Sequence, residues 1–190
     1  MQLDKLQKRV LDISKELELS HIGSNLSVLP ILMEIYDKKQ EGDFVILDNA
    51  HAHLAHSVVK NGSTISVKHY IKKYGIHCDR VAGCDSSGGS LGHGIGIGIG
   101  FALSNPDKTV HVIVSDGSMQ EGANWEALRL IKHFKLDNIK IFANFNSYTA
   151  VEKIDRIELA ERARAFCPNI NIYYTENGKG FEGVKGHYEK

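Results

Sequence analysis

Apolar residues recur at two different spacings along this chain, and the spacing separates helices from strands. Near the start, five apolar residues recur every three or four positions and predict an amphipathic helix over about residues 3–18. The stretch SHIGSN at 20–25 is turn-like, and we expect Ser27 after it to cap a second helix. Pro30 is then tolerable, because it would fall in the first turn of that helix.

Short uninterrupted apolar runs predict buried strands further along the chain. Two of them flank a predicted helix, and a strand, helix and strand of this length form a right-handed crossover between parallel strands. We therefore expect an α/β fold, with a doubly wound, mostly parallel sheet and helices on both faces, as a single domain over residues 1–190. The predicted strands are 44–48, 109–114, 139–144 and about 170–175, and the later helices are 120–134 and about 155–166.

The stretch SLGHGIGIGIGFALS at 90–104 alternates glycine with apolar residues, as a strand would. We favour a helix, because its small residues also repeat every four positions and would form two flat stripes that allow close packing. Each glycine costs roughly 1 kcal/mol of helix propensity relative to alanine, which tight packing must offset. The stripes are Gly92, Gly96 and Gly100, and Gly94, Gly98 and Ala102.

The composition indicates which kinds of partner the protein binds and where in the cell it works. The 23 basic residues balance 23 acidic ones, which argues against a nucleic-acid or anionic membrane partner. The longest nearly uncharged run, 81–105, has an apolar part too short to span a bilayer. The first residues begin a helix and not a signal peptide, and the three cysteines form no CxxC pair. We expect a soluble cytoplasmic protein with reduced thiols.

Two polar residues follow the second and third predicted strands. Asp116 and Asn146 would emerge at the same edge of a parallel sheet, where ligands of such folds bind. A carboxylate and an amide oxygen suit Mg²⁺, which completes its shell with phosphate oxygens and water. Gly117 would let a diphosphate approach the main chain. The same spacing also fits a plain Asp-Gly turn in which Asp116 caps the next helix.

The residues around this pair resemble a known signature. Asp116 and Gly117, QEG at 120–122, WEAL at 125–128, HFKLDN at 133–138 and Asn146 are similar to the thiamine-diphosphate signature of transketolase, with Ser115 in place of its first glycine. The resemblance implies that thiamine diphosphate binds here with Mg²⁺, or with Ca²⁺ or Mn²⁺ in its place. It assigns the metal to Asp116, Asn146 and the main-chain carbonyl of Tyr148.

Four further motifs resemble the family, and they lie before Asp116 in the same order as in the family. SHIGSNLSVLPIL resembles a GHIGGSLSAVDIL-like segment of split transketolases, FVILDNAHA resembles FVLSKGHA, and IHCDR resembles GHPDR. SSGGSLGHGIGIGIGFAL resembles ASTGSLGQGLGIAVGMAL, whose Gly-Ser-Leu-Gly turn contacts the cofactor and precedes a helix. The resemblance implies active-site histidines at His21, His51 and His77, and cofactor contacts at Gly89 and Leu91.

The region after Asn146 departs from the family. We favour Gly178, Lys179 and Gly180 as the counterpart of the family's KGKG loop, with His187 as a further active-site histidine. A rival register aligns ENGKGFEGV with the family's DGHDFEAL helix start and leaves His187 without a role. In either register the diphosphate domain is shortened after residue 150.

Transketolases also use a pyrimidine domain, which the 190 residues do not contain. The resemblance therefore implies a diphosphate-binding subunit with a pyrimidine-domain partner on another polypeptide, as an α2β2 heterotetramer. Glu121 matches a family acid that lies at this interface and links the two active sites. The implied reaction moves a two-carbon ketol unit from a ketose or its phosphate to an aldose acceptor, and small sugars would be the substrates.

Three alternatives stay open. Thiamine diphosphate could serve 2-oxo acid decarboxylation or a deoxyxylulose-phosphate-synthase-like condensation, although several histidines suit sugar hydroxyls better. A non-catalytic, partner-binding relic would explain the shortening, although the pair Asp116 and Asn146 is intact. The run from His51 to His56 could suggest zinc, but its spacing matches no familiar finger. We expect His53 and His56 to be ordinary helix residues.

Overall fold

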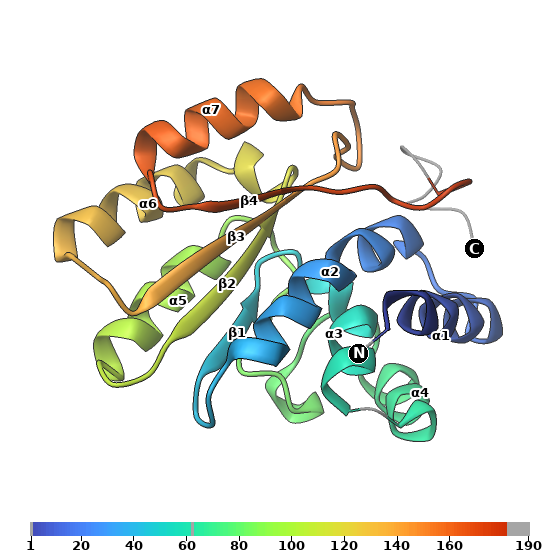
Figure 1. The fold of residues 1–190 in the computed structure, drawn as a ribbon. Coiled ribbons are helices and arrows are strands. Elements are labelled where there is room, and N and C mark those ends of the chain that lie inside the picture. The colour runs from blue at the N-terminus through green and yellow to red at the C-terminus, as the bar shows by residue number, and fades with distance from the viewer. Residues whose placement is uncertain (1, 62, 182–190) are drawn as a thin grey trace.

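Four parallel strands form the centre of the computed structural model, which describes residues 2–61 and 63–181. They lie side by side in sequence order, and every neighbouring pair is parallel (Figure 1). The predicted α/β fold, with a parallel sheet flanked by helices, is confirmed. The strands are β1 (Phe44–Leu47), β2 (Val110–Ser115), β3 (Ile139–Phe145) and β4 (Asn171–Tyr174).

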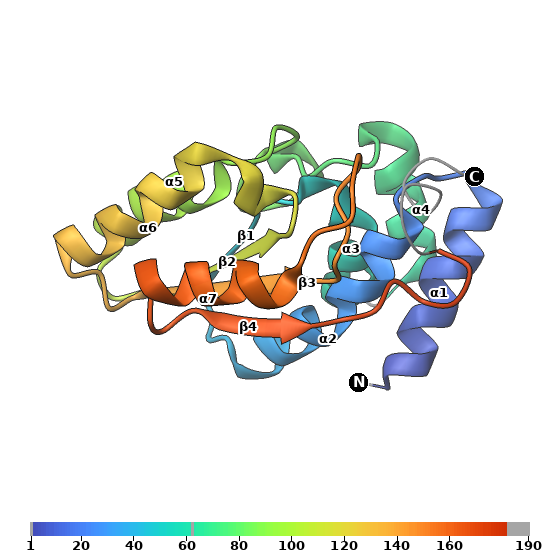
Figure 2. The ribbon, with the colours of Figure 1, turned by 90° about the horizontal axis from the view of Figure 1, so that it is seen from above.

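Helices cover both faces of this sheet (Figure 2). On one face, α2 (Ile22–Lys38) lies against the strands, with α1 (Leu3–Glu16), α3 (His53–Asn61) and α4 (Thr64–Tyr74) gathered around it. The other face carries one helix from each of the three crossovers between neighbouring strands. These are α5 (Gly94–Ser104), α6 (Gly122–Phe134) and α7 (Arg156–Phe166). Three short 3₁₀ turns complete the order: η1 (Ala50–Ala52), η2 (Arg80–Ala82) and η3 (Ser118–Gln120).

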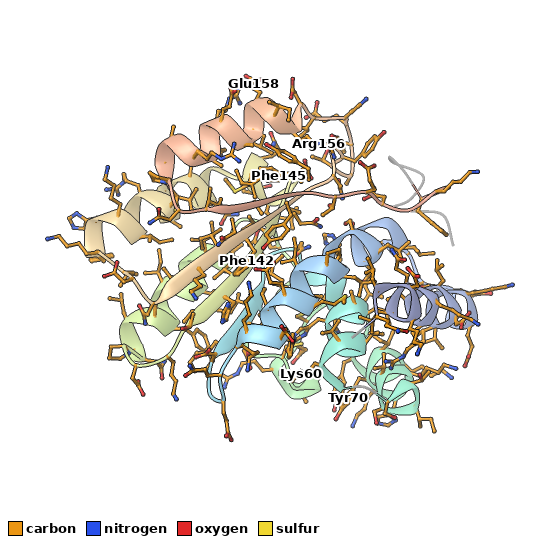
Figure 3. All side chains as sticks on the ribbon, in the orientation of Figure 1. Lys60, Tyr70, Phe142, Phe145, Arg156 and Glu158 are labelled. Carbon is orange, nitrogen blue, oxygen red and sulfur yellow. The ribbon has the colours of Figure 1, made fainter. Side chains whose placement is uncertain are left out.

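Successive side chains of each strand point to opposite faces of the sheet, so each face has its own apolar core. On β3, Phe142 packs among residues of the α1–α4 side, whereas Phe145 packs among those of α5, α6 and α7 (Figure 3). Val45 and Ile46 divide in the same way on β1. Because both faces of β1, β2 and β3 are buried, these strands read as continuous apolar runs, which is why the sequence predicts their positions well.

The glycine-rich stretch forms a helix, α5, as predicted, but the helix begins at Gly94, so Gly92 lies in the turn before it. A Cβ on Gly98 would lie 2.6 Å from Cγ2 of Val112, so α5 approaches β2 more closely than a side chain allows. A Cβ on Gly96 or on Gly100 would meet no described atom within 4 Å. The close approach that offsets the low helix propensity therefore comes from one side of α5.

The predicted start of the second helix is wrong. α2 begins at Ile22, so Ser27 lies inside it and is buried, and Pro30 lies about two turns from its start. His21 takes a left-handed conformation (φ 61°) just before the helix. Gly23 looked like part of a turn because glycine forms helices poorly. Its role is close packing, since a Cβ there would lie 2.6 Å from the carbonyl oxygen of Phe181.

Within residues 2–61 and 63–181, none of the helices has both the length and the apolar character that crossing a membrane requires.

Candidate active site

A cavity of about 200 Å³ lies where the strands end, at the carboxyl edge of the sheet. Ligands of parallel α/β sheets bind at this edge. Segments far apart in the sequence meet around the cavity, so the structure brings most of the predicted site residues together. Those that line it are His21, His51, His77, Gly89, Leu91, Gly117, Asn146 and Tyr148.

Asp116 is fully buried directly beneath this edge, between the ends of β2 and β3. Its two carboxylate oxygens accept hydrogen bonds from the main-chain N–H groups of Asn146 (2.8 Å) and Ser147 (3.2 Å). The α6 helix begins six residues later, with Glu121 as its N-cap residue and no side-chain cap bond. Asp116 is therefore not a helix cap; it joins the ends of two neighbouring strands.

Burial raises the pKa of Asp116 to about 6, and the hydrogen bonds from Asn146 and Ser147 offset part of that effect. An ionised carboxylate has about four lone-pair sites, so two N–H groups leave capacity on both oxygens. A cation beside the carboxylate would favour its charged form. Asp116 therefore fits a metal ligand better than an isolated buried acid.

Asn146 is held from two directions at the end of β3. Its amide oxygen accepts the N–H of Tyr148 at 3.0 Å, and its amide nitrogen lies 3.4 Å from the hydroxyl oxygen of Ser27. The same hydroxyl accepts the Asn144 amide at 3.0 Å. Ser27, expected as a helix cap, instead holds Asn144 on β3 and Asn146 just after it, from the facing helix. Together, the Asp116 carboxylate and the Asn146 amide oxygen form a donor set that suits a hard cation.

Three histidines come to the cavity from three segments. The rings of His21 and His51 lie close together, and Ser20 places its hydroxyl oxygen 2.8 Å from Nδ1 of His21. His77 is exposed and follows α4. The Cys78 N–H beside it donates to the carbonyl oxygen of Ala50 at 3.1 Å, which ties the His77 segment to the residue before His51.

Hydrogen bonds to a buried acid hold the turn at 89–94, and the sequence analysis did not identify this acid. Asp48, buried after β1, accepts hydrogen bonds from the N–H groups of Gly92 (3.0 Å) and Gly94 and from the amide of Asn124 (3.1 Å). Asn124 also donates to the carbonyl oxygen of Ser118 at 2.9 Å. Asp48 is the last residue of the predicted strand 44–48, and an acid at a strand end was a signal available in the sequence, as it was for Asp116.

Glu121 stands at the start of α6 and is exposed. It lies outside the residues that line the cavity. Gly92 has φ 90°, and a Cβ on it would lie 2.6 Å from the Cβ of Glu121, so the turn packs directly against this acid. The contact couples the position of Glu121 to the predicted cofactor turn.

Asn49 is the second residue that the sequence analysis missed. It lines the cavity and is fully buried, yet within the described chain neither its amide oxygen nor its amide nitrogen has a hydrogen-bond partner. Buried amides are nearly always satisfied, so a group that binds in the cavity is the natural partner. Gly117 adds a close approach, because a Cβ there would lie 3.2 Å from Cδ1 of Leu91.

The last described segment crosses the start of α2. Gly178 has φ 83°, and a Cβ on it would lie 2.9 Å from Cδ1 of Leu26. Phe181 contacts Gly23, two residues after His21. The predicted glycine loop at 178–180 therefore lies near the edge of the cavity. Its match to the family's loop stays a prediction, and His187 lies outside the described residues.

A larger cavity of about 590 Å³ lies at the opposite edge of the sheet, around Asp43, Thr109, Ile139 and Asn171. It surrounds the amino ends of the strands, where parallel sheets do not place their ligands. The smaller cavity is therefore the candidate active site.

Comparison with known families places this chain among its relatives. The family described as 1-deoxy-D-xylulose-5-phosphate synthase matches residues 3–160, which is most of the chain. The chain belongs to the N-terminal domain family of transketolase and 1-deoxy-D-xylulose-5-phosphate synthase. Thiamine diphosphate is the cofactor that this family implies.

Members of the family with curated names differ in length. The 6-deoxy-6-sulfo-D-fructose transketolase subunit SqwG of Clostridium sp. is 28% identical, over 87% of this chain and 70% of its own length. One of the apulose-4-phosphate transketolase subunits of Phocaeicola vulgatus is 27% identical, over 87% and 68%. The 1-deoxy-D-xylulose-5-phosphate synthase of Fusobacterium nucleatum is 30% identical over 70% of this chain, which spans 23% of that enzyme.

Solved transketolases of the family share the fold. The enzyme of Campylobacter jejuni superposes with a TM-score of 0.65 at 19% identity, covering 91% of this chain and 37% of its own. The enzyme of Leishmania mexicana gives 0.67 at 18% identity, covering 87% and 31%.

Proposed function

We propose that this chain is the diphosphate-binding subunit of a two-subunit, thiamine-diphosphate-dependent transketolase. The reaction moves a two-carbon ketol unit from a ketose or its phosphate to an aldose acceptor. The observation that carries the proposal is the junction of Asp116 with the main chain at Asn146, beside a cavity lined by three histidines. A metal–diphosphate donor pair and a set of sugar-binding groups thus share one edge of the sheet.

The cofactor end of the site is built from oxygens and glycines. In this proposal Asp116, Asn146 and the main-chain carbonyl of Tyr148 hold Mg²⁺, with Ca²⁺ or Mn²⁺ as substitutes. Gly117, Gly89 and Leu91 lie beside the diphosphate in this proposal. The amide of Asn49, which has no hydrogen-bond partner within the described chain, binds the same group. Bound thiamine diphosphate supplies the electron sink for cleaving a carbon–carbon bond next to a carbonyl.

The substrate end is built from imidazoles. His21, His51 and His77 offer hydrogen bonds to sugar hydroxyls, and they can accept or return protons near neutral pH. His187 is proposed as a further member of this set. A decarboxylase without sugar substrates would need fewer such groups.

A second polypeptide supplies the pyrimidine-binding half in this proposal. Two relatives whose names call them transketolase subunits each align with 87% of this chain, which supports a divided enzyme. We propose an α2β2 heterotetramer, with the exposed Glu121 facing the partner beside Gly92. The described residues then form the diphosphate domain of this enzyme.

A deoxyxylulose-phosphate-synthase-like condensation is the second candidate. The observations that favour it are the family that matches residues 3–160 and the 30% identity to the Fusobacterium nucleatum synthase. The two candidates differ in the donor, because a condensation of this type consumes a 2-oxo acid and releases CO₂, whereas ketol transfer releases an aldose.

Co-expression with a pyrimidine-domain protein tests the proposal. The purified complex, supplied with thiamine diphosphate and Mg²⁺, should transfer a ketol unit from ketose to aldose, and neither chain should do so alone. Activity of this chain alone would contradict the two-subunit claim. CO₂ release from a 2-oxo acid and an aldehyde phosphate, without ketol transfer, would establish the second candidate instead.

The metal assignment has its own test by calorimetry. Asp116→Ala and Asn146→Ala should each abolish Mg²⁺-dependent binding of thiamine diphosphate to the complex. Asp137→Ala is the matched control, because Asp137 lies before the other end of β3, away from the cavity. Unchanged cofactor binding in the first two variants would show that the metal lies elsewhere.

A further inference from the structure

Two cysteines and two histidines cluster in the interior, next to the cavity but outside its lining. Cys78 and Cys84 lie on the loop after α4, and His53 and His56 lie one turn apart on α3. All four side chains are buried. One ligand atom from each of His56, Cys78 and Cys84 lies within 4.8 Å of the others, and Sγ of Cys84 is 3.9 Å from Nδ1 of His56.

The ring of His56 is oriented from its far side. The hydroxyl oxygen of Tyr36 on α2 lies 2.8 Å from Nε2, so with the proton on Nε2 the lone pair of Nδ1 faces Cys84. Burial raises the pKa of the Tyr36 hydroxyl, which therefore stays neutral. A hydrogen bond on the second ring nitrogen is how metal-binding histidines are usually held.

His53 completes the set as a fourth potential ligand. It is fully buried, and neither of its ring nitrogens has a hydrogen-bond partner among the residues that the structure describes. The ring lies near Cys84, but its nitrogens fall outside the 4.8 Å group that His56, Cys78 and Cys84 form. A buried imidazole without a hydrogen-bond partner is unfavourable unless something binds it.

The two sulfurs lie together on the buried side of the loop, within 4.8 Å of each other and of a ring nitrogen of His56. Metals bind cysteine as the thiolate, so an ion at this place would bind both side chains in that form.

We propose that His53, His56, Cys78 and Cys84 form a closed Cys₂His₂ site for a thiophilic divalent cation, with Zn²⁺ as the first candidate. Zinc lies about 2.3 Å from sulfur and about 2.0 Å from nitrogen, so small side-chain rotations close the cluster around the ion. Both cysteines bind as thiolates, so binding releases their thiol protons and needs no oxidant. Four protein ligands leave no open position, so the site is structural rather than catalytic.

The place of the cluster shows what the ion would hold together. His51 lies two residues before His53, and His77 directly precedes Cys78, so two cavity histidines flank two of the ligands. The loop is also held at other points. The Gly88 N–H donates to the carbonyl oxygen of Cys78 at 2.9 Å, and Lys60 reaches that of Gly83 at 2.5 Å (Figure 3). The ion would fix His51 and His77 relative to each other.

Metal analysis of the full chain tests this site. Protein loaded with Zn²⁺ and dialysed should retain one ion per chain, and Co²⁺ in its place should show the absorption of a tetrahedral thiolate complex. Cys84→Ser and His56→Asn should lose both signals, and His53→Gln should weaken Zn²⁺ affinity at least tenfold. Cys167→Ser is the matched control, because Cys167 is outside the cluster and should keep full occupancy.

Three results would overturn the proposal. The first is wild-type protein that is folded by circular dichroism and yet retains neither Zn²⁺ nor Co²⁺. The second is a Cys78–Cys84 disulfide in protein purified without reductant, found by mass spectrometry of unreduced peptides. The third is loss of metal in Cys167→Ser to the same extent as in Cys84→Ser. The wild-type Co²⁺ spectrum decides the question even if a cysteine variant fails to fold.

Discussion

The imidazole rings of His21 and His51 lie with their centroids 4.9 Å apart, and one buried side chain joins their main chains. The amide nitrogen of Asn25 donates to the carbonyl oxygens of His21 (3.0 Å) and His51 (3.2 Å). Its amide oxygen accepts the N–H of Ala55 at 2.9 Å. The relative position of the two histidines therefore depends on a residue that does not line the cavity.

Asn25→Ala should lower the free energy of unfolding by about 2 kcal/mol, because it leaves buried main-chain groups without partners. In the active complex, kcat should fall about tenfold, an order-of-magnitude expectation for two misaligned hydrogen-bonding groups. Cofactor affinity should stay the same, since Asp116 and Asn146 are untouched. Urea denaturation, steady-state kinetics and calorimetry measure the three effects.

Asn105→Ala is the control for that variant. It removes a 2.9 Å hydrogen bond from the Asn105 amide to the Phe101 carbonyl at the far end of α5. Stability should fall, while kcat should not. Equal losses of kcat in both variants would show that Asn25 acts through stability alone.

Asn49→Ala should separate ligand binding from stability. Because the Asn49 amide is buried without a partner in the described chain, its removal should leave the free energy of unfolding unchanged or raise it by about 1 kcal/mol. Binding of thiamine diphosphate with Mg²⁺ should weaken by roughly tenfold, the loss of one hydrogen bond. Thermal denaturation and calorimetry on the same preparations check both.

Asn144→Ala offers the contrast at the same cavity. Asn144 is bonded to the hydroxyls of Ser27 and Thr175, so its loss should destabilise the fold by about 1–3 kcal/mol. If Asn49→Ala were the more destabilising of the two, the Asn49 amide would have a partner in the native chain.

Two glycines of α5 should respond to alanine in opposite directions. Gly96→Ala should stabilise the protein by up to about 1 kcal/mol, because the methyl group meets no described atom within 4 Å and alanine favours helix. Gly98→Ala should destabilise it by about 1–3 kcal/mol, since the methyl group would overlap Val112. Chemical denaturation of the two variants gives the comparison; destabilisation by Gly96→Ala would mean that another surface covers this stripe.

The sequence predicts those features of the fold and site that depend on neighbouring residues, and it fails where residues far apart in the chain make contact. The strands follow from continuous apolar runs, and Asp116 and Asn146 follow from their places at two strand ends. The start of α2 was mispredicted because Gly23 and Ser24 look like turn residues until Phe181, more than 150 positions away, is packed against Gly23. Asn25 and Asn49 were missed because the burial of an amide, and whether it has a hydrogen-bond partner, show only in three dimensions. Asp48 could have been found, since it ends a predicted strand.

The link between α2 and the edge strand should depend on pH. The hydroxyl of Tyr173 on β4 donates to Glu34 at 2.6 Å, and the hydrogen bonds from Lys38 and then Tyr173 lower the pKa of Glu34 below its usual value of 4.5. A lowered acid pKa means that this stability is present above about pH 4.5 and is lost as the pH falls through the folded-state value.

Tyr173→Phe should therefore lower the free energy of unfolding by about 0.5–1 kcal/mol at pH 7, and by less below pH 4. The expected change is small because the pair is partly exposed to solvent. Tyr174→Phe is the matched control, since no hydrogen bond to the Tyr174 hydroxyl is found within the described residues, and it should be nearly neutral at both pH values. Urea denaturation at pH 7 and pH 4 measures the difference. A cost for Tyr173→Phe that grows towards acid pH would contradict the assignment.

Ser27 and Asn144 meet across 117 positions of sequence, so this contact can form only when most of the chain has come together. Contacts of such long range close large loops and tend to form late in folding. The cavity is thus a property of the finished domain and not of any sub-fragment. Cofactor binding would then select fully folded chains, and chains arrested short of β3 would be left to chaperones and proteases.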